Sequence, residues 1–246
     1  MDIVTALAAE GTTCVVGAGG KKTTLYALAD RIDRAVVTAT VRIPIFDDEV
    51  ADVVVTDDPV AAVSAADAWP VGVVPERERS DRYLGYDPGV VDDLAAAGVA
   101  DAVLVKADGA RMRQFKAPAD REPRLPRSAD TVIPIASARV VGAALAEEHV
   151  HRPERVAAIT GLSAGERIGP DDVAAVLASE RGGLKDVPPG ARAVPLVNMV
   201  DDAKLEATGR EIARAVLDRT ADGPVDVPRV VLARMIDDDP LVAVVD

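Results

Sequence analysis

A short glycine-rich segment that follows an apolar run near the start of the chain is the clearest chemical signal in the sequence. Three glycines within four positions allow a sharp turn that brings consecutive backbone N–H groups close to an anion. The apolar stretch from Leu25 predicts a helix, whose N-terminus carries partial positive charge. These features predict the phosphate-binding loop of a nucleotide site, formed by Gly17, Ala18, Gly19, Gly20, Lys21, Lys22, Thr23 and Thr24.

The lysine pair allows two registers of the phosphate-binding motif G-x-x-x-x-G-K-[ST]. If Lys22 is the phosphate lysine, Val16 and Lys21 stand where the motif has glycine. If Lys21 is the phosphate lysine, Gly20 precedes it correctly, but Lys22 replaces the hydroxyl residue that would ligate magnesium. We assign the outer phosphates to Lys22 and the magnesium ion to the Thr23 hydroxyl. An ordinary strand-to-helix turn with exposed lysines is the alternative.

A second candidate motif lies further along the chain, where an apolar run at 103–105 ends in Lys106-Ala107-Asp108-Gly109. In nucleotide hydrolases an aspartate at such a strand end holds magnesium directly or through water. We therefore predict that Asp108 and Thr23 share the metal, and that Asp108 and Lys22 are the catalytic pair. A simple turn after the strand is the alternative, because aspartate followed by glycine is common there.

The segment 106–130 is basic within an acidic chain. It holds seven lysine or arginine residues and four acidic ones. A local excess of positive charge beside a phosphate loop indicates contact with phosphate or another anionic ligand. We single out Lys116 as a ligand-binding residue of this segment. Arginines scattered over a solvated loop are the competing interpretation.

The apolar run 193–197 ends in Asn198-Met199-Val200-Asp201, which has the spacing of the N-K-x-D element that reads guanine. Asn198 and Asp201 are therefore candidate nucleotide-binding residues. Met199 stands where that element has lysine, which weakens the case for guanine. Capping of the next helix by Asp201 is the competing interpretation.

Both histidines of the chain, His149 and His151, lie between Glu148 and Pro153. Imidazole and carboxylate groups can bind a metal, but the sequence shows no third protein ligand nearby. We favour a role for the histidines toward a second ligand or partner, or in the structure, over a metal site.

Nine short apolar runs, rich in valine, alternate with helical stretches. Runs without polar alternation indicate strands covered on both faces, and prolines at 59, 88 and 170 mark helix starts. The pattern predicts one P-loop NTPase-like α/β domain over 1–246, with a doubly wound, mostly parallel sheet and helices on both faces. Ligands of such sheets bind at the carboxyl ends of the strands, where the candidate residues fall. The predicted strands are 13–16, 35–38, 53–55, 71–74, 102–105, 132–135, 193–197, 230–233 and 241–245.

The composition narrows the range of partners. The 246 residues carry a formal net charge of −13, and only six of the 28 basic residues are lysine. This acidity argues against binding to nucleic acid or to an anionic membrane, because both attract lysine and arginine. No run approaches about 18 uncharged apolar residues, and the first residues lack the basic character of a secretion signal. We expect a cytoplasmic protein in which the lone Cys14 is a core residue.

Nine segments spread over most of the chain together form one pattern: 16–24, 107–110, 115–118, 122–123, 147–154, 161–162, 165–166, 187–192 and Asn198. In this order they resemble the YqeC-type family, described as accessory proteins for selenium-dependent molybdenum hydroxylases. The resemblance implies a P-loop nucleotide-binding fold and a role in maturing the selenium-containing molybdenum centre, but no particular reaction. The chain departs from the family in its second loop lysine, in Lys106, where glutamate is typical, and in Met199, where lysine is usual.

The residues and the resemblance together lead to a magnesium-dependent nucleoside triphosphatase. It would bind ATP or GTP and drive a maturation step on a molybdenum hydroxylase or its maturation factors. Thr38 or Thr40, at the end of a predicted strand, would sense the terminal phosphate or complete the metal shell. The equal alternative is that both are β-branched residues that only finish the strand. Two other interpretations stay open: a nucleotide-sensing adaptor or carrier that never hydrolyses, and a phosphotransferase acting on a small anionic substrate held by the segment 106–127.

The acidic composition with few lysines resembles that of proteins from salt-loving microbes and predicts that stability depends on salt. At molar salt the Debye length is about 3 Å, so surface carboxylates hardly repel one another. We expect the melting temperature, measured by circular dichroism, to fall when KCl is lowered from molar concentration to about 0.1 M. A melting temperature that does not respond to salt would contradict this expectation.

Overall fold

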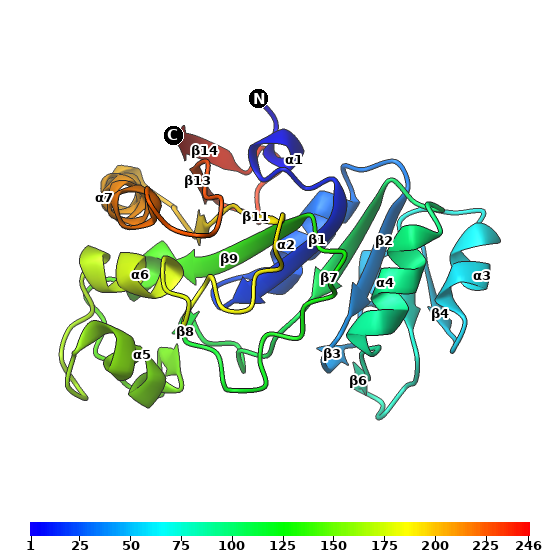
Figure 1. The fold of residues 1–246 in the computed structure, drawn as a ribbon, viewed down its shortest axis with the longest axis horizontal. Helices are drawn as coiled ribbons and strands as arrows, with labels where there is room; N and C mark the ends of the chain where they lie inside the picture. The colour runs from blue at the N-terminus through cyan, green and yellow to red at the C-terminus, as the bar shows by residue number, and fades with distance from the viewer.

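The computed structural model describes residues 1–246 and is built on one large, mostly parallel sheet (Figure 1). Its strands are β1 (Gly11–Gly17), β2 (Ala35–Ala39), β4 (Asp52–Val55), β5 (Val71–Val74), β7 (Ala102–Lys106), β9 (Thr131–Ser137), β11 (Arg192–Ala193), β12 (Leu196–Asn198), β13 (Val230–Ala233) and β14 (Leu241–Val245). Their order is β14-β13-β12-β9-β1-β7-β2-β5-β4, and β11 pairs with β9. Within this sheet only β13 and β14 pair antiparallel. The predicted α/β fold with a mostly parallel sheet is therefore confirmed.

All nine apolar runs form strands, and one of them is divided. Pro195 separates β11 from β12 because it has no N–H to donate to the ladder. Two short strand pairs outside the large sheet were not predicted. The antiparallel pair is β3 (Ile43–Pro44) with β6 (Arg82–Tyr83), and the parallel pair is β8 (Phe115–Lys116) with β10 (Val150–His151). These pairs join segments that are far apart in the sequence.

Seven α-helices connect the strands, and most begin at a side-chain cap. Asp58, Asp87 and Asp202 accept hydrogen bonds from the first turns of their helices, so Asp202 rather than Asp201 caps the helix after β12. Gly20 stands at the start of α2 and provides no side-chain cap. The helices are α1 (Ile3–Ala6), α2 (Lys21–Ala29), α3 (Pro59–Ser64), α4 (Pro88–Ala96), α5 (Pro153–Thr160), α6 (Pro170–Leu177) and α7 (Ala203–Thr220), with 3-10 turns at Asp47–Glu49 and Ala138–Val140.

Helices cover both faces of the sheet. On one face α1 and α2 pack on alternate residues of the central strands, such as Val15 and Leu104. On the other face α3 and α4 pack near Val16 and Val103, while α5, α6 and α7 form a second apolar cluster. Figure 1 shows α2 behind the sheet and α4 and α6 in front of it. No helix combines the length and the apolar character that crossing a bilayer requires.

The parallel order brings the candidate residues to one edge of the sheet. Neighbouring strands β7, β1, β9 and β12 run in the same direction, so their carboxyl ends lie together. In the register Gly17 lies opposite Ile135, and Asn198 lies opposite Ser137. The glycine loop, the segment that follows Lys106, and Asn198 therefore meet at this edge.

Candidate functional site

The glycine loop makes a tight turn between β1 and α2. Gly17, Gly19 and Gly20 have φ values of +88°, +104° and +119°, a region that side chains rarely adopt. A Cβ on Gly19 would lie 2.6 Å from the backbone nitrogen of Ser137, and one on Gly20 would collide with the Asn198 amide. The loop therefore needs glycine both for its backbone conformation and for its close contact with the ends of β9 and β12.

Asn198 holds the loop in place. Its Nδ2 donates to the Gly19 carbonyl at 2.8 Å, and its Oδ1 accepts from the Met235 N–H at 3.0 Å. Both polar ends of this buried amide are thus bonded to the backbone. Asp201 pairs with Arg139 and, at 3.4 Å, with Arg234. The two residues of the N-x-x-D element thus form protein contacts in this structure.

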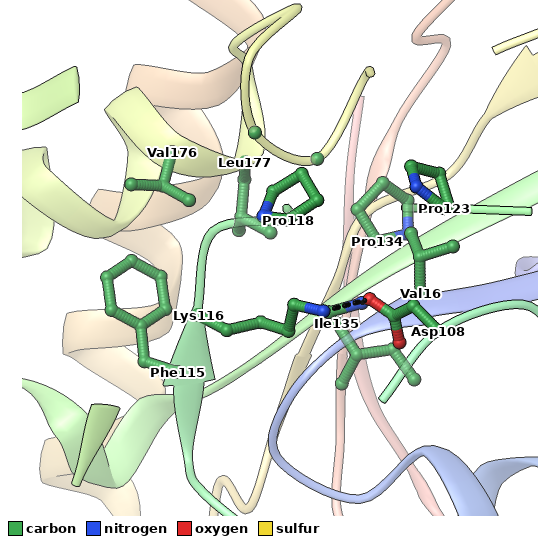
Figure 2. A pocket seen from close by; sticks show the side chains of 13 residues that line it. Val16, Asp108, Phe115, Lys116, Pro118, Pro123, Pro134, Ile135, Val176 and Leu177 are labelled. Atoms are coloured by element: carbon green, nitrogen blue, oxygen red, sulfur yellow. Dashed lines mark hydrogen bonds and ion pairs between the residues drawn. The ribbon is translucent and has the colours of Figure 1, made fainter. Parts of the chain in front are cut away.

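Asp108 is the centre of an ion cluster beneath the loop, and Figure 2 shows its pair with Lys116. Its carboxylate, 1% exposed, has Oδ1 at 2.9 Å from Lys21 Nζ and Oδ2 at 2.8 Å from Lys116 Nζ. The Lys21 contact is an ion pair without hydrogen-bond alignment. Oδ2 also accepts the Gly17 N–H at 2.9 Å, and Lys21 donates to the Gly17 carbonyl. Asp108 therefore ties the glycine loop to two lysines.

The cluster continues outward through a second carboxylate. Glu122 Oε2 lies 2.9 Å from Lys116 Nζ and 2.8 Å from a guanidinium nitrogen of Arg152. Lys21, Lys116 and Arg152 thus face two carboxylates, which leaves one excess positive charge when all five groups are ionised. Burial lowers the pKa of Lys21, and the Asp108 carboxylate opposes that shift. Four of the six lysines of the chain belong to this region, namely Lys21, Lys22, Lys106 and Lys116.

Burial and neighbouring charges set the protonation states. Burial alone would raise the pKa of Asp108, but Lys21 and Lys116 outweigh it and hold that pKa below its usual value. Burial, helped by the charge of Lys21, lowers the pKa of Lys106 to about 7. Burial and the nearby Arg152 lower the pKa of His151 to about 4. At neutral pH the Asp108 carboxylate is therefore ionised and His151 is neutral.

Part of the loop backbone is free to meet an anion. The N–H of Gly17 is bonded to Asp108 and that of Ala18 to the Ile135 carbonyl at 2.9 Å, so these two are committed. The first N–H groups of a helix have no partner within it, and Gly20 offers α2 no side-chain cap. Lys22 and Thr23 are exposed on this turn, whereas Thr24 is buried and donates to the Gly20 carbonyl at 3.1 Å. The backbone N–H groups of residues 19–23 have no hydrogen-bond partner, and Gly20, Lys22 and Thr23 of this stretch are partly or fully exposed. We call this stretch the loop surface 19–23.

The residues present do not fit a magnesium ion shared by Thr23 and Asp108. Two ammonium groups and one N–H already lie against the Asp108 carboxylate, so a metal ion there would meet two cations at close range. Thr23 is exposed on the helix. No three histidine, cysteine, aspartate or glutamate side chains are grouped so as to hold a metal. In this structure Asp108 serves as a lysine anchor.

The remaining candidates have structural contacts. The Thr38 hydroxyl donates to the Val73 carbonyl at 2.7 Å, and the Thr40 hydroxyl to the Arg124 carbonyl at 2.6 Å. His151 lies opposite Lys116 in the pairing of β8 with β10, so the histidine segment does reach the cluster.

Three members of the site carried no predicted role. Ser137 donates its N–H to the Gln114 carbonyl at 3.1 Å beside the loop, and Glu122 and Arg152 complete the ion cluster. Glu122 lies in the segment 122–123 and Arg152 in the segment 147–154. No local sequence pattern shows that these two side chains, 30 residues apart, form an ion pair.

Comparison with known proteins places the chain in a family. The sequence profile of the YqeC protein family matches residues 13–154. The uncharacterized protein YqeC of Escherichia coli (strain K12) is 31% identical over 190 residues, which cover 75% of this chain and 74% of that protein. The chain belongs to the YqeC family. The part matched by the YqeC profile contains the glycine loop, Asp108, Lys116, Glu122 and Arg152, and it leaves out Asn198.

Lys106 predicts a specific pH dependence of stability. Its pKa is about 7 in the folded protein, against an ordinary value of 10.5. Between these values the unfolded chain binds the extra proton, so the free energy of unfolding rises with pH. In urea denaturation from about pH 7 to 10 we expect a steeper rise for the wild type than for Lys106→Met, which lacks the titrating group. Parallel curves for the two proteins would show that Lys106 does not have this low pKa.

Proposed function

We propose that this YqeC protein binds a nucleoside triphosphate, ATP or GTP, with the polyphosphate seated on the loop surface 19–23. The observation that carries the proposal is a glycine turn leading into the uncapped N-terminus of α2, at the carboxyl edge of a parallel sheet. Such a helix start attracts anions through its free N–H groups and its dipole. The net positive charge of the cluster beneath supports the same choice of ligand.

The two loop lysines have different roles in this proposal. Lys22 is exposed and its side chain makes no hydrogen bond or ion pair, so it is free to meet the outer phosphates. Lys21 is buried and remains on Asp108 and Gly17, where it adds fixed positive charge under the loop and keeps the loop closed. Both act on phosphate through charge, as lysines of phosphate loops do.

We further propose that the protein is a P-loop NTPase-like accessory factor for a selenium-dependent molybdenum hydroxylase. This part rests on the YqeC-type resemblance of the sequence. No side chain at the loop is placed as a base for an attacking water, so hydrolysis without a partner is expected to be slow. Release of inorganic phosphate distinguishes this role from a non-hydrolysing adaptor, and a phosphorylated small product would indicate a phosphotransferase.

Thermal shift in molar KCl tests ligand binding directly. A ligand at 100 times its dissociation constant stabilises the fold by about 2.7 kcal/mol, which raises the melting temperature by several degrees. We expect ATP or GTP to raise it, and the corresponding nucleoside, which lacks phosphates, to leave it unchanged. An equal effect of nucleoside and triphosphate, or no effect of ATP, GTP or CTP, would contradict the proposal.

A pair of lysine variants tests the two roles. Lys22→Ala removes a charge-assisted contact worth about 1.5–3 kcal/mol, so we expect roughly 10- to 150-fold weaker triphosphate binding with an unchanged melting temperature of the free protein. Lys21→Ala leaves the buried Asp108 carboxylate short of one partner, so the free protein should lose about 3–5 kcal/mol of stability. Isothermal titration and urea denaturation measure the two effects. Wild-type affinity in Lys22→Ala would remove Lys22 from the site and leave Lys21 as the phosphate lysine.

A further inference from the structure

Lys116 lies in a cage of oxygens that has the chemistry of a cation site. Its side chain is 0% exposed, and its Nζ lies 2.8 Å from Asp108 Oδ2, 2.9 Å from Glu122 Oε2 and 2.7 Å from the Gly109 carbonyl. Two carboxylates and a carbonyl are the oxygen ligands that magnesium, calcium and manganese prefer. Figure 2 shows the extended Lys116 side chain pointing at Asp108. A tethered ammonium group thus fills a position suited to a metal ion.

The charge of the cluster is already positive with this ammonium group in place. Lys21 approaches the other oxygen of Asp108, and Arg152 approaches Glu122 from outside. A divalent ion added beside Lys116 would meet three nearby cations, and both carboxylates there are already paired with basic side chains. The positive charge that a triphosphate requires is supplied here by side chains.

Lysine suits this position better than arginine would. The chain uses arginine for most of its basic residues, yet the buried cage holds a lysine. An ammonium group is a compact point charge, and here it donates to the Gly109 carbonyl and to Glu122 and forms an ion pair with Asp108, whereas a guanidinium is a planar fork.

We propose that Lys116 is a built-in cation that takes the place of a divalent metal, so that polyphosphate binds this site without magnesium. The statement about polyphosphate rests on the proposed function, whereas the oxygen cage does not. Lys116 acts in this account as a positioning residue, since it fixes Asp108 and Glu122 and contributes charge from beneath the loop.

The cage is tested without any nucleotide. Lys116→Ala leaves the oxygens of Asp108, Glu122 and Gly109 around an emptied space, next to a cavity of about 10 Å³ that has room for about one water ligand. We expect this variant to bind Mn²⁺, seen as loss of the free-ion signal in electron paramagnetic resonance and as a rise in melting temperature. The wild type and Lys204→Ala, an exposed lysine on α7, should show neither effect. Equal Mn²⁺ responses in all three proteins would overturn the assignment of the cage.

The wild type provides a second test that does not depend on the folding of a variant. ATP and GTP affinities are measured by isothermal titration in molar KCl, once with EDTA and once with excess MgCl₂. We expect the dissociation constants to agree within about threefold. Binding only in magnesium would overturn the inference and leave the proposed function standing. Binding in neither condition would overturn the proposed function, and with it the role of Lys116 toward polyphosphate, while the Mn²⁺ experiment would still decide on the cage.

Discussion

The candidate site depends on the contacts of one buried group, the carboxylate of Asp108. It joins the end of β7 to Lys21 at the start of α2, to Lys116 on β8 and to the N–H of Gly17. A buried carboxylate is tolerated only where it is paired and hydrogen-bonded. Because the groups that pair with it also form or support the glycine loop, the electrostatics of the cluster and the shape of the loop are inseparable.

The same cluster provides the local positive charge that the proposed anionic ligand would need in an acidic protein. The chain has a net charge of −13, but its cluster of Lys21, Lys116 and Arg152 exceeds the charge of Asp108 and Glu122. At high ionic strength, charges further apart than a few ångströms are screened, so the groups next to the ligand dominate. Buried pairs are screened least, which makes the local cluster more important for binding than the overall charge.

Much of the fold could be predicted because its signals are local. Continuous valine-rich runs gave the strands, and the glycine turn with its following helix gave the loop. The pairing of Lys21 and Lys116 with Asp108 could not be predicted, since it depends on which strand ends become neighbours. The spacing of Asn198 and Asp201 is also a local signal, and it led us to predict that these residues recognise the nucleotide base. In the structure Asn198 hydrogen-bonds the glycine loop and the neighbouring Asp202 caps α7. A short Asn-x-x-Asp sequence is compatible with these structural roles as well as with base recognition.

The central claim is that the backbone around 19–23, above the Asp108 cluster, holds a polyphosphate. A crystal structure of the protein grown in molar salt with a non-hydrolysable triphosphate measures this most directly. The account predicts phosphate density against the N–H groups at the start of α2, with Lys22 turned toward the outermost phosphate and Lys21 still on Asp108. A triphosphate bound elsewhere on the protein, with the loop surface left to water, would contradict it.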